Sequence, residues 1–210
     1  TIGMMSTPML VNPIGGRSQL THHDVTPIAY LFTEPMIVLV RADSPLKSGK
    51  EVVEALRRDP AALSVALTSN GHRISIGMPL TKAGVAIGKV RMPAFKGGGE
   101  TVIAVMGGHA DLMVTSVSTS VPHVSAGKMR GIAVSANARL GGALADVPTW
   151  RELGYQSSGS WKGIIGPKGI TAEQVAFWED VSRKVSLSHG LREDGDKNQW
   201  VLGCKGAADT

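Results

Sequence analysis

Residues 90–114 read VRMPAFKGGGETVIAVMGGHADLMV, and this stretch decides the fold class. Residues 90–95 have the composition of a strand, and the glycines of residues 96–99 predict a loop after it. Residues 100–106 predict a helix that a pair of glycines terminates, and residues 112–114 predict the next strand. A strand, a helix and a second strand in this order form a βαβ unit, which is typical of an α/β protein with a parallel sheet.

The alternation of strands and helices extends in both directions from this unit. Residues 63–67, 129–135 and 161–166 predict further strands, because each is a short apolar run bounded by turn residues. A helix that ends at Gly127 is expected between the predicted strands at residues 112–114 and 129–135. The sequence shows no internal repeat, low-complexity tract or linker that would separate an independent domain.

Three helix starts are marked by Ser or Thr followed three residues later by Glu or Gln, the pattern of a capping box. The boxes begin at Ser48, Thr149 and Thr171. The first predicts a helix with Val52, Val53 and Leu56 on its buried side, and the last predicts a helix with Val175, Trp178, Val181 and Val185 turned inward.

Two stretches carry weaker signals. Pro79 lies inside residues 74–82 and removes one backbone donor, which predicts a helix that is kinked, short or late-starting. Residues 193–197 are charged and aperiodic, which predicts a loop.

Composition limits the classes of partner. The chain has 210 residues, 42% of them hydrophobic, which can form a substantial core without disulfides. Twenty-two basic and 17 acidic residues give a formal charge of +5 and a pI near 9.5, which favours acidic ligands. The basic residues are dispersed and aromatic residues make up only 4%, a composition that argues against nucleic-acid binding.

Membrane insertion and the chain ends give two further expectations. No apolar run approaches the roughly 20 residues that span a bilayer, and the longest, residues 36–40, has the length of a buried strand. The chain opens on Thr1 in an apolar stretch without a signal peptide, so we expect an upstream part to be missing.

Motifs for metals, cofactors and catalysis are absent from the sequence, so we expect none of the three. Cys204 is the single cysteine and has no Cys-x-x-Cys partner. The sequence has no Walker loop, no Gly-x-Ser-x-Gly elbow and no Gly-x-Gly-x-x-Gly fingerprint. The six histidines show no His-x-x-x-His spacing, and they stand at His22, His23, His72, His109, His123 and His189.

A binding site is expected where strands run into small, polar, glycine-containing turns. Four such junctions occur, and in a parallel sheet the carboxyl ends of strands share one edge, where free helix N-terminal N–H groups favour an anion. Hydroxyls and amides can donate to carboxylate oxygens, and glycines let a ligand approach the backbone. The candidate ligand-binding residues are Ser6, Thr7, Thr68, Ser69, Asn70, Gly71, His72, Lys96, Gly97, Gly98, Thr115 and Ser116.

Each candidate has an ordinary structural alternative. Ser, Thr, Asn and Gly are common turn and helix-capping residues, but four such junctions in one sheet favour a site. Lys96 either pairs with a ligand carboxylate or is simply solvated. His72 either acts as a general base or anion donor, or packs at a helix start.

The order of motifs resembles a known family. Residues 95–100 (FKGGGE) and 105–111 (VMGGHAD) are similar to the "YKG…LLGGxxD" stretch of tripartite tricarboxylate transporter receptors, also called TctC or Bug-type proteins. Residues 122–134 (PHVSAGKMRGIAV) resemble their "PHIxAGKLRALAV", and residues 146–149 (DVPT) with Glu152 and Gly154 resemble their "DVPTxxExG".

This resemblance implies a periplasmic-binding-protein-like (Venus flytrap) fold, in which two α/β lobes hold the ligand in a cleft. It implies a non-enzymatic periplasmic receptor that delivers a small organic anion, such as a di- or tricarboxylate, aromatic acid or amino acid, to membrane permease subunits. Residues 1–33 and 161–210 would then form a discontinuous lobe one, and residues 34–160 lobe two. By this resemblance, we expect the family's N-terminal βα units and closing C-terminal helix to be missing from the 210 residues.

Two other functions share the expected crevice. The effector-binding domain of a transcriptional regulator would bind a small molecule equally well, and it would need a DNA-binding domain upstream of Thr1. An enzyme that acts on a small carboxylate would show turnover of its ligand.

Overall fold

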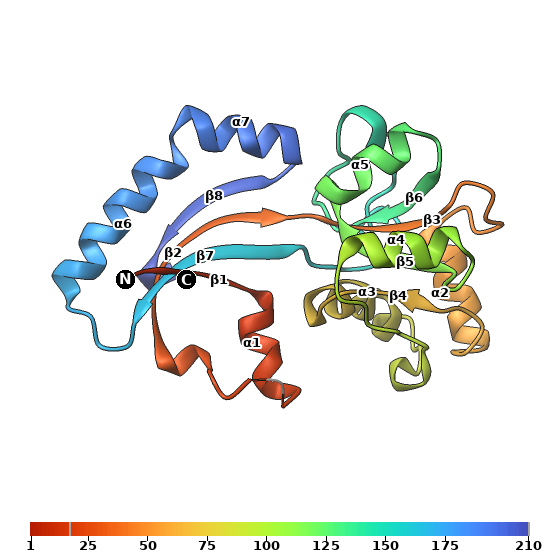
Figure 1. Cartoon of the computed structure of the whole chain (residues 1–210), viewed down its shortest axis with the longest axis horizontal. Coiled ribbons are helices and arrows are strands. Elements are labelled where there is room, and N and C mark those ends of the chain that lie inside the picture. Colours follow the sequence, from red (N-terminus) through yellow and green to blue (C-terminus); the bar gives the residue numbers. More distant parts are fainter. Residues whose placement is uncertain (17, 210) are drawn as a thin grey trace. The chain divides into compact units, whose positions relative to one another are not determined.

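The computed structural model describes residues 1–16 and 18–209 and divides the chain into two compact units (Figure 1). Unit 1 consists of Thr1–Glu34 and Ser160–Thr210, and unit 2 is Pro35–Gly159. The expected boundaries lay after residues 33 and 160. Each unit has its own four-stranded sheet with helices packed on it, which is the α/β class that the sequence predicted.

Unit 1 is built on a sheet of strand order β1-β7-β2-β8 in which every neighbouring pair is antiparallel, in contrast to the expected parallel sheet. Helix α1 packs on β1 and β7, and α6 packs on β2 and β8. The strands are β1 (Gly3–Ser6), β2 (Val25–Glu34), β7 (Ser160–Pro167) and β8 (Val201–Gly206), and the helices are α1 (Thr7–Ile14), α6 (Ala172–Ser186) and α7 (His189–Asn198).

Helix α6 begins at the predicted capping box. Thr171 and Gln174 exchange hydrogen bonds between side chain and backbone at 3.0 and 3.2 Å. Val175, Trp178 and Val181 are half-buried as expected, but Val185 is 44% exposed, so the prediction that it points inward was wrong. The buried stripe of α6 therefore ends one turn before the helix does.

The expected loop at residues 193–197 is part of helix α7. Ser188 starts this helix by accepting a hydrogen bond from the Leu191 amide at 3.3 Å. Gly195 packs against Leu202 of β8, where an added Cβ would lie 3.0 Å from the leucine side chain. A helix whose inward contact is a glycine shows no apolar periodicity, which explains why the sequence pattern failed here.

Unit 2 is built on a mixed sheet of order β4-β5-β3-β6. Strands β4 and β5 are parallel, and β3 runs antiparallel to both β5 and β6. The strands are β3 (Met36–Arg41), β4 (Val65–Ala66), β5 (Leu112–Ser116) and β6 (Met129–Val134), and the helices are α2 (Gly49–Arg58), α3 (Asn70–Lys82), α4 (Gly98–Met106) and α5 (Val117–Ser125).

The sheet of unit 2 is buried on both faces. Val38 and Val40 of β3 face a core shared with α2, α3 and Trp150, whereas Ile37 and Leu39 face a second core shared with α4 and α5. Because alternate residues of one strand point to opposite faces, a strand between two helical layers reads as a continuous apolar run. Residues 36–40 are such a run.

Two predictions in unit 2 need correction. The expected strand at residues 90–95 is reduced to isolated bridges at Arg91 and Ala94, because the intervening Pro93 can accept but not donate a ladder hydrogen bond. Helix α3 starts at Asn70 and continues through Pro79, so it is neither short nor late-starting. Pro79 has no N–H for the carbonyl of Ser75, and the Ser157 hydroxyl donates to that oxygen instead at 2.8 Å.

Candidate functional site

Three of the four predicted junctions lie at one edge of the unit 2 sheet. Strand β4 is parallel to β5, and Leu67 forms a parallel bridge with Ala94. The carboxyl ends of these three segments therefore point the same way, and each leads directly into a helix, α3, α4 or α5. Three helix N-termini at one edge present backbone N–H groups and the positive ends of helix dipoles, which favour a bound anion.

The start of α3 is organised by local hydrogen bonds. Ser69 is the N-cap and accepts from the His72 amide at 3.3 Å. The amide and the hydroxyl of Thr68 lie 3.4 and 3.2 Å from His72 Nδ1. Asn70 and Gly71 form the first helical turn. The His72 ring therefore contacts Thr68 at the helix start, and its role as a general base or anion donor stays a prediction.

The start of α4 exposes its backbone. Gly97 is the N-cap in an extended conformation, with no side-chain cap on the helix. A Cβ added to Gly98 would lie 3.5 Å from Thr119 Cγ2, so the first turns of α4 and α5 are adjacent. The Lys96 amide donates to Glu100 Oε2 at 3.0 Å, and the Lys96 side chain is exposed.

The start of α5 carries a group of hydroxyls. Ser116 is the N-cap, and its Oγ lies 3.0 Å from the hydroxyl oxygens of both Ser118 and Thr119. Thr115 is only 4% exposed and pairs with Ile37 in the sheet, so its side chain is largely removed from solvent. Ser116 is the more accessible hydroxyl of the predicted pair.

The fourth junction, Ser6 and Thr7, belongs to unit 1. Ser6 ends β1 and is the N-cap of α1, where it makes no side-chain capping bond. Thr7 is 9% exposed, and its Oγ1 is buried without a hydrogen-bond partner among the described residues. Convergence of all four junctions on one crevice remains a prediction.

A polar pocket at the end of strand β6 was not predicted from the sequence. Strand β6 is parallel to β5, since both are antiparallel to β3, and the chain leaves β6 through Ser135 and Asn137. These residues line a pocket of about 400 Å³ together with Trp150, Arg151 and other residues of unit 2. The signal was available, because a Ser-x-Asn turn follows the predicted strand at residues 129–135.

The turn that carries Arg151 is held by the capping box at Thr149. The Thr149 amide donates to Glu152 Oε2 at 2.7 Å, and the Glu152 amide donates to Thr149 Oγ1 at 3.1 Å. The hydrogen bond from the Thr149 backbone, together with one from Arg139, holds the pKa of Glu152 below its ordinary value. The box therefore heads a tight turn beside the pocket, and the helix start predicted at Thr149 was wrong.

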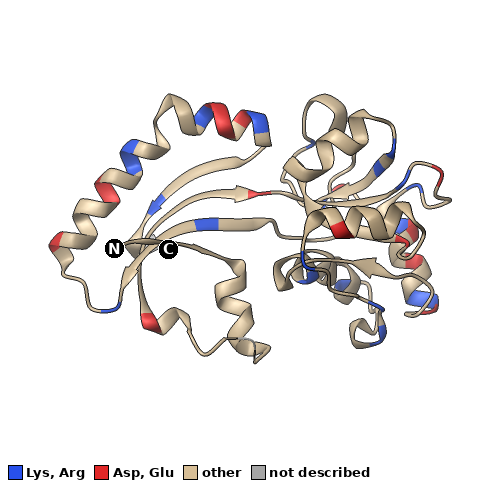
Figure 2. Cartoon of the chain, viewed as in Figure 1, with Lys and Arg blue, Asp and Glu red and all other residues tan. Residues whose placement is uncertain are grey.

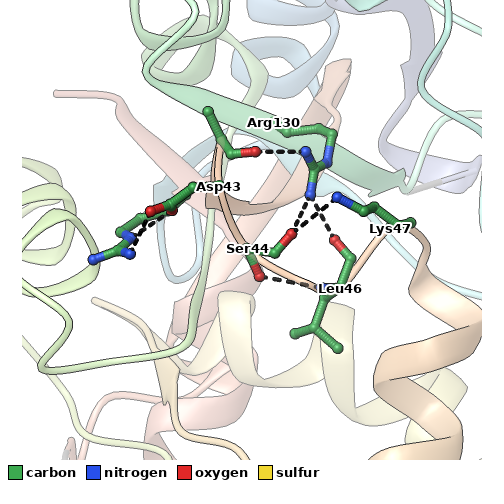
Figure 3. Close-up of polar contacts among 7 residues, drawn as sticks. Asp43, Ser44, Leu46, Lys47 and Arg130 are labelled. Carbon is green, nitrogen blue, oxygen red and sulfur yellow. Dashed lines mark hydrogen bonds and ion pairs between the residues drawn. The ribbon is translucent and has the colours of Figure 1, made fainter.

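An arginine clamp fixes the loop between β3 and α2 (Figure 3). The guanidinium of Arg130 donates to the carbonyl oxygens of Ala42, Ser44 and Leu46 at 2.6, 2.8 and 2.9 Å. Arg41 forms an ion pair with Asp43 in the same loop, and this hydrogen-bonded contact lowers the pKa of Asp43. The two terminal nitrogens of Arg130 donate to backbone carbonyls, which gives the residue a structural role, while its Nε is buried without a hydrogen-bond partner among the described residues.

Within the described residues, neither the charged side chains nor the potential metal ligands form a competing site. Basic and acidic residues are interspersed along the elements of each unit (Figure 2). Within residues 1–16 and 18–209, no group of three His, Cys, Asp or Glu side chains is placed to hold a metal ion. No helix in the described part of the chain combines the length and the apolar character needed to cross a membrane.

Comparison with solved structures identifies the fold as periplasmic-binding-protein-like. The crystal structure of a TctC solute-binding protein from Polaromonas matches 99% of this chain and 71% of its own, with 25% identity and a TM-score of 0.77. MatC from Rhodopseudomonas palustris, solved with bound malate, matches 96% of this chain and 69% of its own, with 23% identity and a TM-score of 0.73.

The chain belongs to the tripartite tricarboxylate transporter receptor family (TctC), whose pattern matches residues 1–197. Receptors of this family are solute-binding proteins, which are a non-enzymatic class. Among curated relatives, a UPF0065 protein of Bordetella pertussis is 24% identical over 169 residues, which are 80% of this chain and 52% of that protein. The protein BugT of the same organism is 24% identical over 158 residues, or 73% of this chain and 47% of BugT. The chain thus spans about half the length of these curated relatives.

Proposed function

We propose that this protein is the extracytoplasmic substrate-binding receptor of a tripartite tricarboxylate-type transporter. It binds a small organic carboxylate in the periplasm, releases it unchanged, and delivers it to membrane permease subunits. The single observation that carries this proposal is the edge of unit 2, where α3, α4 and α5 begin side by side in a chain of the TctC family.

The edge suits a carboxylate because its donors are mainly backbone amides and hydroxyls. Gly97 leaves the N-terminal amides of α4 without a side-chain cap, and Ser116 adds a hydroxyl at the start of α5. Hydrogen bonds from such donors to an ionised acceptor are about twice as strong as those between neutral groups. A charged side chain is therefore not required to hold the ligand.

The names of two structural relatives support a carboxylate ligand. MatC was solved with bound malate, and another protein of Rhodopseudomonas palustris was solved with adipate. These two acids have two carboxylates on chains of different length. We therefore propose the dicarboxylates as the first ligand class to test.

Thermal unfolding of the 210-residue protein tests the proposal. Malate, adipate and other organic acids are compared with the corresponding diamides, which keep the shape and lose the charge. A ligand at 100 times its Kd stabilises the folded state by about 2.7 kcal/mol, so binding raises the Tm by several degrees. Nuclear magnetic resonance of the recovered ligand then distinguishes a receptor from an enzyme.

The outcome has clear meanings. A Tm rise with an acid but not with its diamide, and recovery of the acid unchanged, supports the receptor. Conversion of the acid to a product would contradict it. Equal stabilisation by acid and diamide would show that the site does not select for negative charge, and the helix N-termini would lose their assigned role.

A further inference from the structure

Unit 1 contains a pocket of about 540 Å³ that the carboxylate site of unit 2 does not use. It lies on the face of the unit 1 sheet that carries α1, because Leu10 of α1 lines it together with Met5, Tyr30 and Trp161 of the strands. A pocket of this volume is within the ordinary range for small-molecule sites.

The strand register explains why the pocket exists. Met5, Gly163, Tyr30 and Lys205 are aligned across the four strands and project from the same face, because directly paired residues in antiparallel strands share a side. Gly163 has no side chain, so the row is interrupted between Met5 and Tyr30. The Tyr30 ring lies over Gly203, where an added Cβ would come within 2.9 Å of the ring.

The lining combines an apolar body with a single lysine at its edge, Lys205. Met5, Leu10, Pro27 and Trp161 supply apolar surface, and Leu10 remains 37% exposed. The Tyr30 hydroxyl is within 3.0 Å of the Thr33 hydroxyl. Among the described lining residues, Lys205 carries a positive charge and no side chain is acidic. This charge pattern complements a molecule with an apolar part and one negative group.

We propose that unit 1 carries a second binding site, on its α1 face, for an amphipathic monoanion such as an arylalkyl carboxylate. The apolar body lies in the gap above Gly163, between Met5, Leu10 and Trp161. The carboxylate lies at the rim beside Lys205. This site is lined by residues of unit 1 alone and takes a ligand of different chemistry.

Calorimetry with 4-phenylbutyrate on the full chain tests this site, with 4-phenylbutyramide as the uncharged control. A ligand of this size in such a pocket binds with a Kd on the order of 0.1–1 mM. Leu10→Trp fills the pocket and lowers the affinity at least about tenfold. The matched control is Ile14→Trp on the same helix, because Ile14 is 86% exposed and does not line the pocket.

The charge is tested separately. Lys205→Met lowers the affinity for the acid about threefold to fivefold, toward that of the amide, because an exposed ion pair contributes little. Lys197→Met, in an exposed position of α7, leaves both affinities unchanged. At a malate concentration that stabilises the protein in thermal melts, malate does not displace the probe, and this result separates the site from the proposed carboxylate site.

Several results would overturn the proposal. No binding of 4-phenylbutyrate at about 10 mM, or normal binding to Leu10→Trp, would remove the pocket as a site. Equal affinities for the acid and the amide in the unmodified chain would remove the role of Lys205. Light scattering provides the last check, because a concentration-dependent dimer that Leu10→Trp abolishes would assign this face to a second copy of the chain.

Discussion

A matched pair of glycine substitutions at the start of α4 separates stability from binding. Gly98 and Gly99 are the first two residues of this helix, and neither has a positive φ. Replacement of a glycine by alanine at a compatible position stabilises the fold by about 0.4–1 kcal/mol, chiefly by restricting the unfolded chain. We therefore expect both Gly98→Ala and Gly99→Ala to raise the Tm by about 1–4 °C.

Binding should distinguish the two variants. A Cβ on Gly98 lies between the first turns of α4 and α5, 3.5 Å from Thr119 Cγ2, whereas a Cβ on Gly99 has no neighbour within 4 Å. A methyl group between the turns keeps a carboxylate away from the Gly98 amide. Loss of one hydrogen bond to a charged group costs about 1.5–3 kcal/mol, so Gly98→Ala should weaken binding by about tenfold or more.

The assay is calorimetric titration with the acid that stabilises the unmodified protein most strongly, alongside thermal melts of the three proteins. Gly99→Ala should bind within about twofold of the unmodified chain, since its added methyl group meets open space. If Gly98→Ala gains the expected stability and binds normally, no ligand approaches the backbone at α4. If both variants lose affinity equally, the effect is not local to the helix start.

Three further predictions concern binding, pH and the loop clamp. In calorimetry, Asn70→Ala and Ser116→Ala should bind the acid more weakly by about 1–3 kcal/mol, and Lys96→Ala should bind it nearly as well as the unmodified protein. Loss of binding in Lys96→Ala alone would show that the lysine ammonium, and not the helix N-termini, holds the ligand. Because the pKa of Glu152 is lowered, its stabilising hydrogen bonds are complete above its ordinary pKa and are lost as the pH falls through the lowered value. In thermal melts between about pH 5 and about pH 3, the Tm of Glu152→Gln should therefore fall less than the Tm of the unmodified protein. An identical fall in Tm would contradict this prediction. Arg130→Met should lower the free energy of unfolding by about 1–3 kcal/mol in urea titrations, and unchanged stability would show that the three carbonyls are satisfied by water.

The fold class could be predicted from the sequence because periodicity and capping signals are local. The capping box at Thr171 marks a helix start that the structure confirms, and residues 129–135 overlap strand β6 almost completely. The failures occurred where distant residues decide the local structure. Helix α7 depends on Gly195 fitting against Leu202, and the sheet of unit 1 is antiparallel because β1 and β2 both pair with β7 from the far end of the chain.

The candidate site was predictable in part for the same reason. The junctions at Asn70, Gly98 and Ser116 each have a local sequence signature, and strand direction alone places them at one edge. The pocket beside Arg151 was missed because its walls come from α3, the residues after β6 and the turn at Trp150. No single stretch of sequence shows that these three segments meet.

Pro79 illustrates how a local defect becomes a tertiary contact. A proline in a helix leaves the carbonyl four residues earlier without its usual donor, and burial of that oxygen without a partner would be costly. The Ser157 hydroxyl supplies the missing hydrogen bond to the Ser75 carbonyl, and the two serine hydroxyls lie 3.2 Å apart. Ser157 lines the same pocket as Met78 of α3 and Arg151. The residue that the sequence rules treat as a helix breaker thus ties α3 to the segment that completes the pocket, and the helix keeps its N-terminus at the carboxyl edge of the sheet.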